Sequence, residues 1–91
     1  MDEKTVLVTG AAGGIGRATA LRLASEGASL LLCDVQDEAT SETAAMCRDA
    51  GVEAKSLHCD VGSDEQVDAA VAASVKYYGK LDAVINVAGI L

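Results

Sequence analysis

Short apolar runs alternate with longer stretches of helical periodicity along the chain. Residues 5–9 (TVLVT) form a continuous run of β-branched residues and leucine, a pattern typical of a strand buried on both faces of a parallel sheet. Residues 29–33 (SLLLC) repeat this pattern, residues 53–59 form a weaker run, and residues 84–87 form a fourth. The chain is therefore expected to contain four strands.

A helix is predicted between the first two runs, from about residue 14 to residue 26. Gly27 would end it as a C-terminal cap, since glycine readily adopts the left-handed conformation found there. One face of this helix has small residues at i, i+4, i+7 and i+8 spacing. These residues are Gly16, Ala20, Leu23, Ala24 and Gly27.

Two further helical patterns follow the second and third runs. The first, at about residues 37–50, is polar, ends at Gly51, and has an inner stripe made of Thr40, Ala44 and Cys47. The second begins after Ser63, which forms a capping box with Gln66: each side chain is expected to bond the backbone N–H of the other residue. Its core side is expected to consist of Val67, Val71, Ser74, Val75 and Tyr78.

The predicted element order is β-α-β-α-β-α-β. Strands joined by helical crossovers lie parallel with right-handed connections, which predicts the strand order 3-2-1-4. The expected class is α/β: the first half of a Rossmann-type, doubly wound parallel sheet in a three-layer α/β/α arrangement. Residues 1–91 would form a single domain, truncated at its C-terminal end relative to a complete doubly wound sheet.

Composition and charge narrow the range of partners. The 91 residues are 51% apolar, which argues against disorder, and the net charge of −7 argues against nucleic acid or an anionic membrane as a partner. No apolar run approaches the roughly 20 residues of a membrane span, and the N-terminus lacks the features of a signal peptide. The widely spaced Cys33, Cys47 and Cys59 indicate reduced, buried thiols in a cytoplasmic protein, without a metal site.

The strongest chemical signal is the glycine-rich segment between the first strand and the first helix. It reads Thr-Gly-Ala-Ala-Gly-Gly-Ile-Gly over residues 9–16. A pyrophosphate is bound by backbone N–H groups at a helix N-terminus, and bulky side chains in the turn would block its approach. Gly10 would allow the sharp turn, Gly14 the close approach of the phosphates, and Gly16 tight packing of helix on strand. The alternative is a glycine-rich turn without a ligand.

Three motifs together resemble one known family, the short-chain dehydrogenases/reductases. The spacing of residues 9–16 matches that family's T-G-x-x-x-G-x-G motif. Asp60-Val61 follows the third strand, and Asn86-Val87-Ala88-Gly89 at the fourth matches the family's N-x-A-G or N-N-A-G element. The resemblance extends over all 91 residues and implies an oxidoreductase that transfers hydride between a nicotinamide cofactor and an alcohol or carbonyl substrate.

Asp34 indicates which dinucleotide would bind. It lies 18 residues after Gly16 at the end of the second strand, where a carboxylate accepts hydrogen bonds from the ribose hydroxyls. The same carboxylate would repel a 2′-phosphate, and neither Ala12 nor Gly13 supplies a basic side chain to bind one. NAD is therefore favoured over NADP. The alternative for Asp34 is a helix N-cap or a solvated loop acid.

The resemblance assigns further cofactor contacts. Asp60 would meet the adenine amino group with the Val61 backbone beside the ring, although a plain turn residue is the alternative. The stretch from Asn86 to Gly89 would border the ribose. The full set expected to bind the dinucleotide is Gly10, Ala12, Gly13, Gly14, Ile15, Gly16, Asp34, Val35, Asp60, Val61, Asn86, Ala88 and Gly89.

Other reactive residues are interpreted as structural. Tyr77, Tyr78 and Lys80 do not have the four-residue Tyr–Lys spacing of the family, so Tyr78 is expected to be a core anchor at the end of the third helix. His58 has no carboxylate partner nearby in sequence and is not expected to be catalytic. Arg17 could approach a phosphate but is expected to be a surface residue.

No catalytic residue is assigned to this chain. In the family, the resemblance implies a Tyr general acid/base, a Lys four residues later and a Ser, often with an Asn, and all of these would lie beyond residue 91. The chain alone is expected to be inactive, and the complete enzyme is expected to be a homo-oligomer. The alternatives are a naturally short, non-catalytic dinucleotide-binding or regulatory module and another Rossmann-like class such as a methyltransferase, which the Asn86–Gly89 motif opposes.

Overall fold

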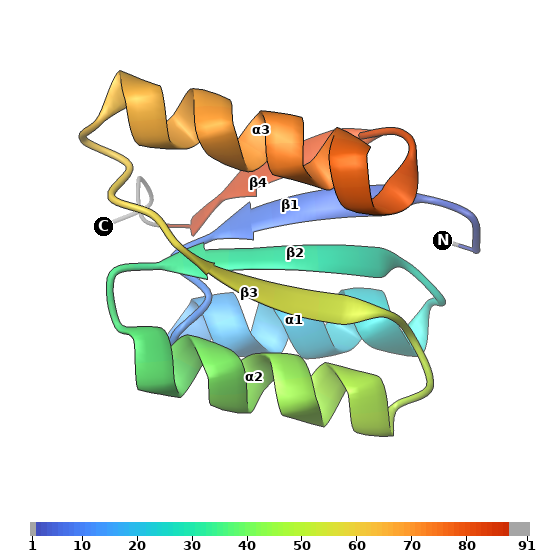
Figure 1. Cartoon of the computed structure of the whole chain (residues 1–91). Coiled ribbons are helices and arrows are strands. Elements are labelled where there is room, and N and C mark those ends of the chain that lie inside the picture. Colours follow the sequence, from blue (N-terminus) through green and yellow to red (C-terminus); the bar gives the residue numbers. More distant parts are fainter. Residues whose placement is uncertain (1, 88–91) are drawn as a thin grey trace.

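Four strands and three helices alternate along the chain, as the sequence predicts (Figure 1). The computed structural model describes residues 2–87. The elements are β1 (Thr5–Thr9), α1 (Gly14–Ser25), β2 (Ser29–Asp34), α2 (Asp37–Asp49), β3 (Ala54–His58), α3 (Asp64–Tyr78) and β4 (Ala83–Asn86). Each bound lies within two residues of the predicted one.

The strands form one parallel sheet in the order β3-β2-β1-β4, which confirms the predicted topology. Helices α1 and α2 cover one face and α3 covers the other, giving three layers (Figure 1). Because all four strands run in the same direction, their carboxyl ends meet at one edge of the sheet. The connections after β1, β2 and β3 therefore start side by side.

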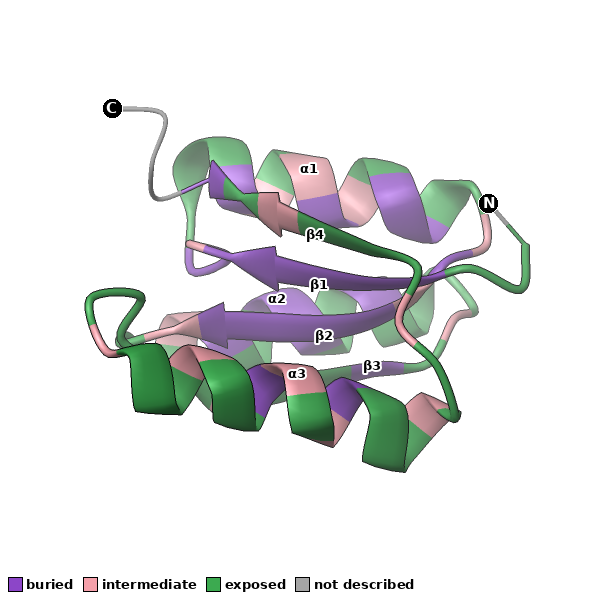
Figure 2. Ribbon diagram, turned by 90° about the horizontal axis from the view of Figure 1, so that it is seen from above, coloured by how far each residue is buried: buried purple, intermediate pink, exposed green. Residues whose placement is uncertain are grey.

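Two apolar clusters hold these layers together. Alternate residues of β1 and β2 point to opposite faces, so Val6 and Val8 pack with α1 and α2 whereas Leu7 packs with α3. Both clusters are covered by helices, and this double burial explains why the first two strands have no polar alternation. Figure 2 shows β1 and β2 as the most buried strands, whereas much of β3 and β4 is exposed.

Helix α1 has the expected packing face: Gly16, Ala20, Leu23 and Ala24 are buried. Gly27 follows the helix with φ +89° and so supplies the left-handed residue predicted there. This face of α1 packs closely on the sheet, which explains why most of its residues are small.

Helix α3 packs on the sheet through Ser74, Val67, Val71 and Tyr78, as predicted, and differs from the prediction at Val75. Ala70 and Ser74 are its buried residues, and Val75, predicted to lie in the core, is 47% exposed. Ala70 and Ser74 lie one turn apart and mark the middle of the face that packs on the sheet. Val75 lies about 100° around the helix from Ser74, so it is turned away from this face. Tyr78 is the predicted anchor of α3. It packs on the apolar cluster between α3 and the sheet, and its hydroxyl donates to the Leu30 carbonyl oxygen at 2.7 Å.

The capping box of α3 is half formed. The Ser63 hydroxyl accepts from the Gln66 N–H at 3.3 Å, but the Gln66 side chain accepts from the Asp60 N–H at 2.8 Å instead of from Ser63. The reason is that the Ser63 N–H already donates to the Asp60 carbonyl oxygen at 2.9 Å. The cap therefore ties the start of α3 to the end of β3.

Candidate functional site

The segments singled out in the sequence meet around a small cavity at the carboxyl edge of the sheet. Its volume is about 150 Å³. The lining residues come from the ends of β1, β2 and β3, and they are Gly10, Asp34, Val35, Cys59, Asp60 and Val61. Only Cys59 in this lining was missing from the expected binding set. The position of Cys59 beside Asp60 at a strand end could have indicated that it lines the site, but the sequence analysis interprets this cysteine only as a buried thiol.

The glycine-rich turn leaves the strand at Gly10. Gly10 has φ +77°, and its N–H donates to the Cys33 carbonyl oxygen at 2.8 Å, so the turn is fastened to β2. A Cβ placed on Gly16 would collide with the Gly10 carbonyl oxygen. Gly16 therefore has the close-packing role that the motif predicts.

Gly13 and Gly14 face open space at the start of α1. A Cβ built on either residue meets no heavy atom within 4 Å. Gly13 occupies the N-cap position, so no side chain caps the helix, and no acidic residue lies in its first turn. The geometry is suited to an anion, because the first N–H groups of a helix and its dipole both favour negative charge. Gly14 has φ +56°, which is a second reason for glycine that the sequence did not show.

Asp34 lies at the end of β2 with its carboxylate held by backbone. One oxygen accepts from the Ala12 N–H at 3.2 Å and the other accepts from the Gln36 N–H at 3.1 Å. The N-cap of α2 is Gln36, so the alternative of Asp34 as a helix N-cap is wrong. The carboxylate instead links the glycine-rich turn to the connection before α2.

Asp60 is exposed and takes part in the turn after β3. Its carboxylate accepts from the Gly62 N–H at 2.9 Å. Asp60 is thus a turn residue, as the alternative interpretation held, and at the same time it lines the cavity. Val35 and Val61 also line the cavity, and both are exposed apolar residues.

At the end of β4, Asn86 lies beside Thr9. The Thr9 hydroxyl donates to the Asn86 side-chain oxygen at 2.9 Å and joins the carboxyl ends of β1 and β4. The expected contacts Ala88 and Gly89 lie outside the described residues.

Two residues have surroundings that the sequence analysis did not predict. Arg17 is not a surface residue: its side chain is 26% exposed and bonds four protein groups. His58 has a carboxylate partner after all, since its Nδ1 lies 2.6 Å from the Asp37 carboxylate. Apart from the Ala12 carbonyl, the partners lie more than twenty positions away in the chain, so no local pattern in the sequence reveals them.

The cysteines are free and buried, as predicted. Burial raises the pKa of Cys33 to about 12 and also raises the pKa values of Cys47 and Cys59. These thiols are therefore protonated near neutral pH and are poor nucleophiles. Within residues 2–87, no group of three His, Cys, Asp or Glu side chains could hold a metal ion, and no helix is long and apolar enough to cross a membrane.

Comparison with known proteins gives a consistent set of relatives. The family model for short chain dehydrogenases matches residues 4–91. The short-chain reductase protein NovJ of Streptomyces niveus is 44% identical over 89 residues, which are 98% of this chain and 34% of that protein. A 3β-hydroxysteroid dehydrogenase of Mediterraneibacter gnavus is 42% identical over 99% of this chain and 33% of that protein. The chain thus spans about a third of the length of these curated relatives.

Solved structures show the same likeness in three dimensions. A crystal structure of NAD⁺-bound xylitol dehydrogenase has a TM-score of 0.87 and is 48% identical, covering 91% of this chain and 32% of that chain. A short chain dehydrogenase/reductase from Burkholderia phymatum in complex with NAD also has a TM-score of 0.87, at 37% identity, covering 91% of this chain and 30% of that chain.

Proposed function

Since this chain belongs to the short-chain dehydrogenase family, we propose that it binds NAD(H) at the carboxyl edge of its sheet. It would form the cofactor-binding part of an oxidoreductase that acts on an alcohol or carbonyl compound. The observation that supports this most directly is the link between Asp34 and the glycine-rich turn. The Ala12 N–H donates to the Asp34 carboxylate at 3.2 Å, so the group that would bind ribose and the turn that would bind pyrophosphate form one unit.

The open side of the turn fits a pyrophosphate. Gly13 and Gly14 place no side chain over the uncapped start of α1, and the nearby Ala12 and Ile15 add none that is charged. Backbone N–H groups and the helix dipole would neutralise part of the phosphate charge. Gly10 and Gly16 hold this turn close to β1.

The cavity at the carboxyl ends of β1, β2 and β3 has a size and a lining suited to the adenine ring of the cofactor. Val35 and Val61 offer exposed apolar surface to a base, and the Asp60 carboxylate, which lines the same cavity, would accept from an amino group. On β4, Asn86 would border the ribose together with Ala88 and Gly89. NAD rather than NADP is the proposed cofactor because the Asp34 carboxylate would repel a 2′-phosphate.

When bound, the nicotinamide ring supplies the site that gives or accepts hydride, and the residues of this chain hold and orient the cofactor. General acid–base chemistry needs a titratable group within hydrogen-bond reach of the reacting oxygen. We propose that the family's Tyr, Lys and Ser lie in sequence that follows Leu91. Residues 1–91 would then form one dinucleotide-binding domain of a longer, cytoplasmic and homo-oligomeric enzyme. The three buried free thiols are consistent with a reducing compartment.

The test is cofactor binding by the complete protein that contains these residues. Titration with NADH, followed by fluorescence, should give saturable binding, and Gly13→Val should abolish it. Gly13 is the sharpest position for this change because its φ of −174° is extended and its Cβ has open space, so valine blocks a ligand without straining the backbone. Ala72→Val is the control: this exposed residue lies in the middle of α3 and outside the cavity lining, so valine adds bulk there without reaching the site.

Retained NADH binding in folded Gly13→Val protein would show that the motif is only a turn. The reading frame after residue 91 separates the enzyme from a non-catalytic module. A downstream Tyr-x-x-x-Lys together with NAD-dependent turnover supports the enzyme, whereas a stop codon favours the module. The chain exactly as printed should show no turnover with any alcohol or ketone.

A further inference from the structure

Arg17 is bound to more groups than any other side chain near the candidate site. Its Nε donates to the Thr43 hydroxyl at 2.9 Å, and one terminal nitrogen lies 3.2 Å from the Glu42 carboxylate. The other terminal nitrogen donates to two carbonyl oxygens, that of Ala12 at 3.3 Å and that of Ala39 at 3.1 Å. An arginine has five N–H donors, so four of them are used by protein oxygens.

The two carbonyl groups belong to the two backbone segments that hold the Asp34 carboxylate. Ala12 belongs to the glycine-rich turn, and its own N–H donates to one oxygen of the Asp34 carboxylate. Ala39 belongs to the first turn of α2, just after Gln36, whose N–H donates to the other oxygen. One guanidinium therefore joins the two backbone segments that hold the carboxylate.

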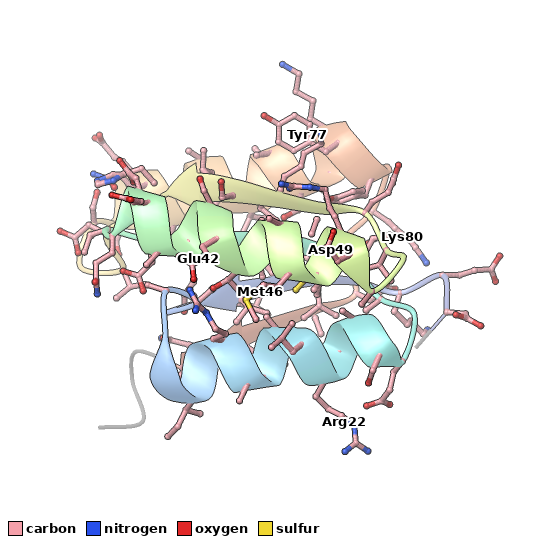
Figure 3. All side chains as sticks on the ribbon, turned by 90° about the horizontal axis from the view of Figure 1, so that it is seen from below. Arg22, Glu42, Met46, Asp49, Tyr77 and Lys80 are labelled. Atoms are coloured by element: carbon pink, nitrogen blue, oxygen red, sulfur yellow. The ribbon has the colours of Figure 1, made fainter. Side chains whose placement is uncertain are left out.

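Helix α2 in turn fixes the guanidinium. Thr43 is fully buried, and its hydroxyl both accepts from Arg17 and donates to the Ala39 carbonyl oxygen at 3.1 Å. Glu42 lies on the side of α2 that faces α1 (Figure 3). A planar group with donors in a rigid fork can bridge several oxygens at once, which the single ammonium group of a lysine cannot do in the same geometry.

We propose that Arg17 is a positioning residue for Asp34: it holds the glycine-rich turn and α2 at the separation that places the carboxylate against the adenosine ribose. It thereby sets the preference for NAD over NADP without contacting either cofactor's 2′ position. This inference rests on the proposed function. In this role Arg17 does not bind a phosphate, because protein oxygens already use four of its five N–H donors.

The experiment measures Kd for NAD(H) and for NADP(H) in the complete protein and in Arg17→Met. Loosening the carboxylate weakens the ribose hydrogen bonds of both cofactors, but for NADP this loss is offset because the repulsion of the 2′-phosphate also weakens. We therefore expect binding of NAD(H) to weaken about fivefold to tenfold and binding of NADP(H) to change by less than twofold. The ratio of the Kd for NADP(H) to the Kd for NAD(H) should then fall by a factor of at least two and a half. Arg17→Lys should recover only part of the ratio.

Arg22→Met is the matched control on the same helix. Arg22 is 79% exposed, pairs only with Glu26 at 3.0 Å among the described residues, and points away from the body of the protein (Figure 3). It should leave both Kd values unchanged. If Arg17→Met does not fold, Thr43→Val removes the acceptor of the Arg17 Nε with little change in buried volume. This variant should also lower the ratio of the Kd for NADP(H) to the Kd for NAD(H).

Three results would overturn the proposal. Equal weakening of both cofactors in Arg17→Met would indicate a merely structural role, and a larger loss for NADP(H) than for NAD(H) would indicate direct phosphate contact. If Thr43→Val has to replace Arg17→Met, an unchanged ratio of the two Kd values in folded Thr43→Val would likewise indicate a merely structural role. If the proposed function itself is wrong, the unmodified protein will not bind NADH, and this result is distinct from the three above.

Discussion

Replacing Asp34 by alanine should convert an NAD-selective site into one that discriminates weakly. The carboxylate is the acidic group at the end of β2, and it is held by the N–H groups of Ala12 and Gln36. In the proposed binding mode, its removal takes away both the acceptor for the ribose hydroxyls and the negative charge that a 2′-phosphate would meet. The change therefore acts on the two cofactors in opposite directions.

The magnitude follows from the charge and its exposure. Two unit charges 4 Å apart repel by about 4 kcal/mol at an effective dielectric of 20 and by about 1 kcal/mol in bulk water. Asp34 is half-buried at the rim of the sheet, so the value lies between these limits. The unmodified protein should prefer NAD(H) by at least tenfold, which corresponds to about 1.4 kcal/mol. Asp34→Ala should shrink this gap, mainly by tightening NADP(H).

Titration of both cofactors against both proteins is the assay, with Asp49→Ala as the control. Asp49 ends α2, at the opposite edge of the sheet from Asp34, so its loss changes the net charge equally without changing the site (Figure 3). A thermal melt checks the fold, because the buried Ala12 loses a hydrogen-bond acceptor. Equal affinities in the unmodified protein, or an equal response to Asp34→Ala and Asp49→Ala, would refute the electrostatic argument.

Three predictions concern stability. Gly16→Ala drives a Cβ onto the Gly10 carbonyl oxygen and should destabilise the protein by about 1–3 kcal/mol in urea unfolding; an unchanged midpoint would show that α1 can shift freely. Tyr78→Phe loses a bond to a strand carbonyl and should cost about 1 kcal/mol in the same assay, so a neutral effect would contradict its role as an anchor. The Thr5 N–H donates to Asp82 at 2.7 Å and lowers the pKa of that carboxyl, so its stabilisation is present above pH 4 and disappears as pH falls through the lowered pKa. Melting temperatures of the unmodified protein and Asp82→Asn should therefore converge in acid, and a gap that persists there would oppose this account.

The strand order and the burial of β1 and β2 were predictable because they follow from patterns within short windows. A continuous apolar run such as TVLVT has one common explanation, burial between two helical layers. Turn residues were equally accessible: Gly10, Gly27 and Gly51 all have positive φ. The glycine motif could be assigned because its spacing and its place between strand and helix reinforce one another.

The side-chain network around the site was not predictable. Arg17 bonds Thr43 and Glu42, which follow it by 26 and 25 positions, and His58 pairs with Asp37 across 21 positions. Such contacts depend on how α1, α2 and β3 are placed relative to one another in space. The charge of a side chain such as Arg17 suggests by itself only that it is exposed to solvent. The exposure of Val75 has a similar origin, since periodicity identifies an apolar face but not which part of it the sheet covers.

The pairing of β1 with β4 also affects the order in which the protein can form during its synthesis. Thr5 bonds Asp82, and Thr9 bonds Asn86, each across 77 residues. β1 leaves the ribosome first and can pair with β2 early, but its other edge stays open until nearly the whole described chain has been made. Closing so long a loop is entropically costly, and an open strand edge is a template for pairing with other chains. A nascent chain that stalls before β4 should therefore be the form most prone to aggregation and the one most dependent on chaperones.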